Sequence, residues 1–165
     1  MSAGRTCAQH QTQHPPSWWD SSDDSSRGAM AFTAPFSGGC LCGQLRYTSA
    51  EAPRFQVVCH CTDCQKSSGS AFSVNLGVRK EALTVTGRLA TYESRADSGN
   101  PVLRKFCPEC GSPVMTEIAL DPGLAILKAG TLDDPSWVRP QRHIFCASRQ
   151  HWGHLPEDVP THDRF

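Results

Sequence analysis

Short runs of alternating apolar and polar residues follow one another from Gln44 onward, and turn residues separate them. Alternation with a period of two indicates half-buried β-strands, because successive side chains of a strand point to opposite faces. The pattern is clearest in LTVTGRLATYES, where Gly87 divides two runs and predicts a hairpin. We expect strands at residues 44–48, 54–58, 71–78, 82–86, 89–94, 102–106, 113–117, 124–129 and 143–147.

Helical periodicity is weak along the chain. Short helical pieces are expected only after Cys61 and around residues 133–137, where the proline of DDPSW suits a turn or the start of one helical turn. A chain of 165 residues fits one domain with a modest core. The pattern therefore predicts a mainly β domain of twisted antiparallel sheets built from short strands.

The first thirty residues differ from the rest in composition. They are rich in Ser, Asp, Gln, His and Pro and lack the periodic apolar positions from which a core is built. We expect residues 1–30 to form a disordered N-terminal leader and residues 31–165 to form the folded domain. The change at Met30 is abrupt, which suggests that Met30 is the natural start; no role is assigned to Cys7 in the leader.

Charge and cysteine content narrow the class of protein. Lys+Arg and Asp+Glu number 16 each, so there is no net field to attract nucleic acid. The chain shows neither the apolar core of a signal peptide nor an apolar run that would span a membrane. Nine cysteines in such a chain indicate metal-thiolate sites in a reducing compartment. We expect a cytoplasmic protein with no membrane or nucleic-acid partner.

Seven of the nine cysteines fall into three clusters, GGCLCGQ, VVCHCTDCQ and KFCPECGSP. A CxxC turn directs two thiolates at one ion, and the glycine after CPEC suits the tight turn of a zinc knuckle. Because a closed tetrahedral site needs four ligands, we expect a structural zinc site formed by Cys40, Cys42, Cys107 and Cys110. A zinc ribbon that joins Cys61 and Cys64 to the CPEC pair remains an alternative.

The remaining cluster offers three sulfurs close together in the sequence: Cys59, Cys61 and Cys64. Three protein ligands and one open position are typical of catalytic zinc. The alternative is a second closed site whose eighth ligand comes from His60, Cys146 or the leader. His60 lies between two proposed ligands and should point away from the metal, whereas Cys146 is most simply a small buried hydrophobe.

The cysteine order, together with GGCLCGQLRY, CHCTDCQKSSGSAFSVNLGV, KFCPECGSPV and AGTLDDPSWVRPQRHIFCASRQHW, closely resembles the glutathione-dependent formaldehyde-activating enzyme family, also called centromere-protein-V-like. The resemblance covers essentially everything after the leader. It implies a mostly β fold stapled by two zinc ions per chain. It also assigns the structural zinc to Cys40, Cys42, Cys107 and Cys110, and the catalytic zinc to Cys59, Cys61 and Cys64.

The activity that the resemblance implies is that of a carbon–sulfur lyase, which reversibly joins formaldehyde to glutathione, or to another thiol, as in S-(hydroxymethyl)glutathione. The substrate carboxylates and a bound oxyanion would need partners, for which the candidates are Lys66, Arg104, Lys105, Arg142, Ser67, Ser68 and Ser70. A non-catalytic zinc-binding interaction module is the main alternative function. A third is a thiol-redox or zinc-storage protein, because an open three-cysteine site is exposed to oxidation.

Overall fold

The computed structural model describes residues 34–155 and 158–164. The predicted leader at residues 1–30, the start proposed at Met30 and the unassigned Cys7 lie outside these residues. The elements are β1 (Phe36–Gly39), β2 (Arg46–Ser49), β3 (Phe55–Cys59), α1 (Thr62–Ser68), β4 (Ser73–Arg79), η2 (Lys80–Ala82), β5 (Leu83–Thr86), β6 (Ala90–Arg95), β7 (Pro101–Phe106), β8 (Pro113–Ile118), β9 (Asp121–Lys128), η3 (Ala129–Thr131), β10 (Arg142–Ile144) and η4 (Cys146–Ser148).

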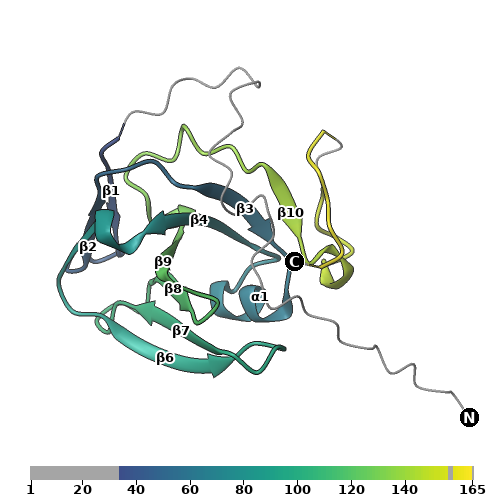
Figure 1. Ribbon diagram of the computed structural model, residues 1–165, viewed down its shortest axis with the longest axis horizontal. Coiled ribbons are helices and arrows are strands. Elements are labelled where there is room, and N and C mark those ends of the chain that lie inside the picture. Colours follow the sequence, from purple (N-terminus) through teal and green to yellow (C-terminus); the bar gives the residue numbers. More distant parts are fainter. Residues whose placement is uncertain (1–33, 156–157, 165) are drawn as a thin grey trace, which may run out of the picture.

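The strands form two sheets, and the prediction of a mainly β domain gave no number of sheets. The smaller has the order β1-β2-β5, and the larger has the order β10-β3-β4-β9-β8-β7-β6. All strand pairs are antiparallel except β10 with β3, which is parallel. The larger sheet curves, and α1 lies on its inner side (Figure 1). The mainly β class is confirmed, and no helix in the described ranges is long and apolar enough to cross a membrane.

The hairpin predicted at Gly87 is wrong. The turn exists, with a φ of 92° at Gly87, but β5 pairs with β2 and β6 pairs with β7. The chain passes at this point from the smaller sheet to the larger one. A side chain at position 87 would collide with the backbone of Gln44, so the glycine serves close packing as well as the turn.

One strand was not predicted, and another is shorter than predicted. β1 was missed because it includes Gly38 and Gly39, and glycine is a weak strand former. A side chain at Gly38 would strike the ring of Tyr47, so the packing requires glycine there. β10 ends at Ile144, because Phe145 adopts a left-handed conformation with φ of 58° and starts a 3-10 turn. Residues 145–147 therefore do not continue the strand.

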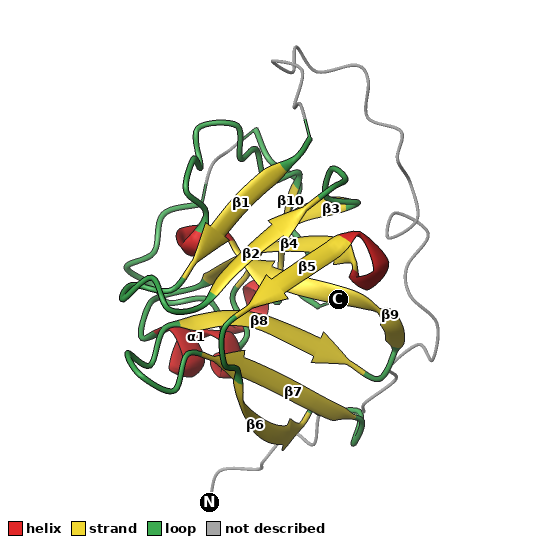
Figure 2. Cartoon of the chain, turned by 90° about the vertical axis from the view of Figure 1, so that its left-hand side faces the viewer, coloured by secondary structure: helices red, strands yellow, loops and turns green. Residues whose placement is uncertain are grey.

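Two hydrophobic cores lie on opposite faces of the larger sheet. One joins β1 and β2 to the larger sheet, with Phe36 and Tyr47 packed among residues such as Leu76 and Leu127. Figure 2 shows β1, β2 and β5 lying across the larger sheet near β4 and β9. The second core includes Phe55, Val57, Cys59, Leu124 and Ile144. Each core reaches one of the cysteine clusters, so the sheet separates the two groups of thiols.

Candidate metal centres

The structure brings four cysteine thiols together between the loop after β1 and the loop after β7: Cys40, Cys42, Cys107 and Cys110. Their Sγ atoms all lie within 4.8 Å of one another. The Cys40 and Cys42 sulfurs are 3.4 Å apart, and those of Cys42 and Cys107 are 3.8 Å apart. Thiolates at about 2.3 Å from a tetrahedral Zn²⁺ lie roughly 3.8 Å apart, so the spacing suits that ion.

Tight turns present these thiols. The Gly43 NH donates to the Cys40 carbonyl at 3.1 Å, and the Gly111 NH donates to the Cys107 carbonyl at 2.9 Å. Both glycines have positive φ, 77° and 73° respectively, which explains why each turn ends in glycine. Ser112 ties the two loops together, because its hydroxyl accepts from the Leu41 NH at 3.1 Å.

Hydrogen bonds already favour thiolate at part of this cluster. The Ser112 hydroxyl and the backbone NH groups of Ser112 and Cys42 lower the pKa of Cys110 to about 5. Burial raises the pKa of Cys40, but the Leu45 NH and the neighbouring thiols outweigh it and the net pKa is lowered. Deprotonated sulfur is the form that binds a metal, so the cluster is prepared to act as a ligand set.

A second cluster brings together the thiols of Cys59, Cys61 and Cys64, whose Sγ atoms lie within 4.8 Å of one another. Cys59 is the last residue of β3 and is buried, while Cys61 is the N-cap of α1. The Cys61 sulfur accepts a hydrogen bond from the Cys64 NH at 3.3 Å. The start of the helix thus turns Cys61 and Cys64 toward the end of the strand, since capping fixes their relative placement.

Electrostatics in this cluster concentrate negative charge on one sulfur. Hydrogen bonds from Cys59 and Cys61 lower the pKa of Cys64 to about 3, and the positive charges of Lys128 and Arg104 contribute. The hydrogen bonds of Cys59 with Cys61 and Cys64 raise the pKa of Cys59 well above its usual range. A metal ion that binds here would displace the remaining protons, as metal binding to thiols generally does.

The second cluster holds no fourth candidate ligand within the described part of the chain. His60 points away from it, as predicted, and its Nε2 lies 2.9 Å from Nδ1 of His143 in a buried pair. Cys146 is buried in η4 and belongs to neither cluster. The grouping also differs from the zinc ribbon alternative, since Cys61 and Cys64 lie with Cys59. A ligand from the leader would lie outside the described residues.

A cavity of about 190 Å³ is lined by residues of α1, β6, β7, β8 and β9 and by none of the cysteines. Three of the predicted substrate contacts line it: Ser67, Arg104 and Lys105. Ser67 lies one helical turn beyond Cys64 in α1, and its hydroxyl donates to the Cys64 carbonyl at 3.2 Å. The cavity lining does not include the other candidates Lys66, Arg142, Ser68 and Ser70.

Sequence reasoning missed Lys128 as a residue of this site. It ends β9, lines the cavity and donates a hydrogen bond to Oδ1 of the buried Asn75 at 2.9 Å. Its signal was present, because Lys128 is the only charged residue of the apolar run LAILKA. A charge at the end of a buried strand is unusual and favours a functional role.

The family model described as glutathione-dependent formaldehyde-activating enzyme matches residues 35–148. Relatives from Aspergillus flavus and Aspergillus oryzae carry that name provisionally. Each is 33% identical over an alignment of 134 residues, and the match covers 76% of this chain and 70% of the relative. A crystal structure of a Rhodobacter sphaeroides protein is 18% identical with a TM-score of 0.49 and covers 76% of this chain and 98% of that one. Since the family model spans more than half of the 165 residues, the chain belongs to the glutathione-dependent formaldehyde-activating enzyme family.

Proposed function

We propose that the chain is a zinc-dependent carbon–sulfur lyase that reversibly joins glutathione, or a similar thiol, and formaldehyde. One zinc would be structural, held by Cys40, Cys42, Cys107 and Cys110. The other would be catalytic, held by Cys59, Cys61 and Cys64. The observation that carries the proposal is the second cluster itself: three thiols within 4.8 Å, with no fourth ligand among the described residues.

The donor chemistry fits zinc at both clusters. Soft thiolates select zinc over magnesium or calcium, and the sulfur spacing at the first cluster matches a tetrahedral ion. Four thiolates would leave Zn²⁺ with a net charge of −2, whereas three would leave −1 and one open position. When bound at the three-thiol cluster, zinc would hold an incoming thiol as thiolate or polarise an aldehyde oxygen.

The residues around the three-thiol cluster would position two small reactants. Cys64 is held by the first turn of α1, and Cys59 is buried at the end of β3, so neither sulfur has much freedom. The cavity lined by Ser67, Arg104 and Lys128 has room for a small thiol. Arg104 lines the cavity while its Nη2 donates to Asp63 at 2.9 Å, which fixes the guanidinium near α1. Such positioning alone supplies much of the rate enhancement for a reaction between two small molecules.

The relatives support the choice of reactants. Their provisional name describes activation of formaldehyde with glutathione, and the family model has the same description. We extend this chemistry to the present chain because all seven cysteines that the resemblance assigns to zinc gather in the two clusters.

Exchange between glutathione and formaldehyde, followed by NMR, tests the proposal. Hemithioacetal formation also proceeds without enzyme, so the quantity to measure is the exchange rate above that of a protein-free sample. We expect the zinc-loaded protein to raise this rate and Cys61→Ser to return it to the protein-free value. Serine can keep the helix cap that Cys61 provides, so this variant should stay folded.

The control variant is Cys146→Ser, which replaces a buried thiol outside both clusters. It should exchange like the wild type. Equal exchange by the wild type and Cys61→Ser would contradict a catalytic role for the three-thiol cluster. Zinc-loaded protein that gives only the protein-free rate would instead favour the non-catalytic zinc module.

A further inference from the structure

Lys128 occupies a prepared position on the face of the larger sheet that bears the three-thiol cluster. Asn75 pairs with Lys128, and Cys59 pairs with Ser73. Directly paired residues of antiparallel strands share a face, as do residues two apart on one strand. Cys59, Ser73, Asn75 and Lys128 therefore all lie on one face.

Two buried side chains hold Lys128 in place. Asn75 Oδ1 accepts one hydrogen bond from Lys128 Nζ and another from the Ser73 hydroxyl, both at 2.9 Å. Asn75 and Ser73 are buried at 6% and 5% exposure. An ammonium carries three N–H donors, so the hydrogen bond to Asn75 leaves two for other acceptors. Ser73 and Asn75 thus hold the lysine in place and leave two of its N–H donors available.

The charge of Lys128 is not neutralised by a carboxylate. The other two cations that line the cavity have one: Arg104 pairs with Asp63 at 2.9 Å, and Lys105 pairs with Glu117 at 2.6 Å. Lys128 has no ion pair within residues 34–155 and 158–164. Burial outweighs the negative charges of Cys64, Cys59 and Cys61, so the pKa of Lys128 is lowered overall. The thiolates are the source of negative charge that acts on this lysine.

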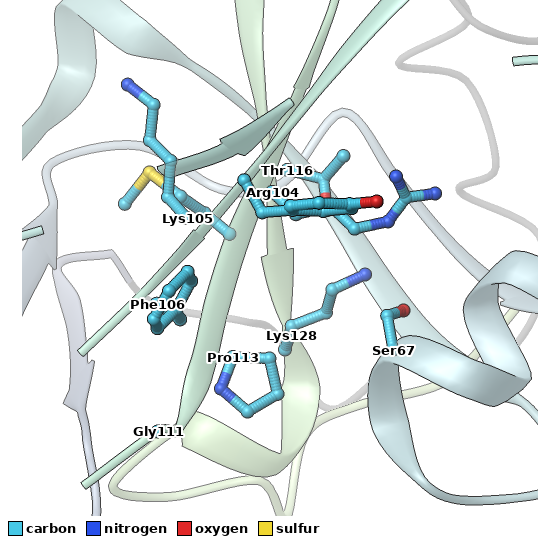
Figure 3. A pocket seen from close by; sticks show the side chains of 10 residues that line it. Ser67, Arg104, Lys105, Phe106, Gly111, Pro113, Thr116 and Lys128 are labelled. Atoms are coloured by element: carbon cyan, nitrogen blue, oxygen red, sulfur yellow. The ribbon is translucent and has the colours of Figure 1, made fainter. Parts of the chain in front are cut away.

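The cavity links this ammonium to the helix that carries part of the cluster. In Figure 3 the Lys128 side chain extends toward the space between Ser67 and the guanidinium of Arg104. Ser67 lies one helical turn beyond Cys64, near the other end of α1. Cys59 shares the face of Lys128, so a thiol bound at the cluster would lie on the same side of the sheet as the ammonium.

We propose that Lys128 is a catalytic residue that stabilises the oxyanion formed when a thiolate adds to the aldehyde; this inference rests on the proposed function. In that step the thiolate sulfur forms a bond to the carbonyl carbon, the C=O π pair moves to oxygen, and RS–CH2–O⁻ results. Lys128 donates a hydrogen bond to this oxygen and keeps its proton. Water then protonates the oxygen to give RS–CH2–OH and hydroxide, and the reverse reaction follows the same path.

The position of Lys128 favours the oxyanion over a substrate carboxylate. Lys128 shares a sheet face with Cys59, and it lines the cavity with Ser67 of the helix that carries Cys64, so it lies on the side of the reacting atoms. The carboxylates of glutathione are separated from its sulfur by several bonds. Donors fixed in advance at a developing oxyanion contribute on the order of 100-fold or more to catalytic rates.

A pair of small thiols tests the charge contact without catalysis. Thioglycolate and 2-mercaptoethanol both carry oxygen two carbons from sulfur, but only thioglycolate is negatively charged there. We expect zinc-loaded wild type to bind thioglycolate about 10-fold more tightly than 2-mercaptoethanol in calorimetry, as a charge-assisted hydrogen bond predicts. Lys128→Met should lose this preference, and Lys128→Arg should retain most of it. Lys80→Met, which alters a lysine that pairs with Glu117 outside the cavity lining, should keep it.

Catalysed exchange is measured on the same proteins with glutathione and with 2-mercaptoethanol, which has no carboxylate. Lys128→Met should lower it on the order of 100-fold for both thiols. Loss with glutathione alone would overturn the proposal and assign Lys128 to a carboxylate. Equal loss of thioglycolate preference in Lys128→Arg and Lys128→Met would also overturn it. Wild type that shows the preference without any catalysed exchange would refute the proposed function and leave the charge contact standing.

Discussion

Two cysteines with the same chemistry lie in very different surroundings. Cys107 is only 1% exposed and belongs to the core between the two sheets. Cys61 is half-buried at the start of α1 and packs at the edge of the second core. Loss of a metal ligand should therefore disturb folding at Cys107 far more than at Cys61, because a structural metal site contributes its binding energy to folding.

Cys107→Ser should lower the free energy of unfolding by about 3 kcal/mol or more, because it removes a ligand and leaves a hydroxyl in the core. The measurement is denaturant unfolding of zinc-loaded protein, followed by circular dichroism. Cys61→Ser is the matched variant and should lose less than about 1 kcal/mol, since serine keeps the cap. An equal loss in both variants would indicate two closed structural sites.

The cysteine spacing and the family resemblance together led to the two groups of thiols, and the structure brings the same residues together. CHCTDC carries its three sulfurs within a few residues, so spacing reports their grouping, whereas spacing alone left open which cysteines join CPEC. Lys128 and Asn75 could not be found in this way. They meet only because β4 and β9 pair, although 52 residues separate them, and strand pairing depends on the whole fold.

At the scale of elements, β10 holds the segment that carries the three thiols. It pairs in parallel with β3, and the His60 NH donates to the Ile144 carbonyl at 3.0 Å. The buried His60 and His143 rings, whose centroids are 5.2 Å apart, add a side-chain link between Cys59 and Cys61 and the last strand. This pairing is the physical reason that His60 turns away from the metal cluster.

The histidine pair should make stability depend on pH. Burial lowers the pKa of His143 below its ordinary value of 6.5. The unfolded chain then binds the proton more readily, so the stabilisation is complete above pH 6.5 and is lost as the pH falls through the folded-state pKa. Unfolding between about pH 7.5 and 5.5 at fixed zinc should show a steeper loss for wild type than for His143→Gln, which cannot titrate.

Acid also releases zinc from thiolates, but this affects both proteins alike. The difference between the two slopes therefore isolates the histidine. Parallel slopes would contradict a neutral buried His143.

Strands could be predicted where the alternation of apolar and polar residues was strong. The pairing of those strands could not be predicted. The alternating run around Gly87 identified β5 and β6 correctly as strands. Alternation does not report which sheet a strand joins, however, so two strands next to each other in sequence were wrongly paired. β1 was not predicted because two of the four residues of FSGG are glycines, which are weak strand formers. Gly38 is required there because its backbone packs closely against the ring of Tyr47.

At the scale of the molecule, one curved sheet separates two thiol clusters with different surroundings. The four-thiol cluster joins the smaller sheet to the larger one, with Cys40 and Cys107 inside that core. The three-thiol cluster lies on the opposite face, where the positive charges of Lys128 and Arg104 act on Cys64. Zinc at the first would be enclosed by four ligands, while zinc at the second would have three ligands and one open position.

Native mass spectrometry of the zinc-loaded protein during treatment with a mild chelator tests this difference most directly. The account predicts two zinc ions per chain, of which one leaves readily while the folded protein retains the other. Cys61→Ser should hold only the retained ion. Release of both ions together at one rate, or a single ion in the untreated wild type, would contradict the assignment of one closed and one open site.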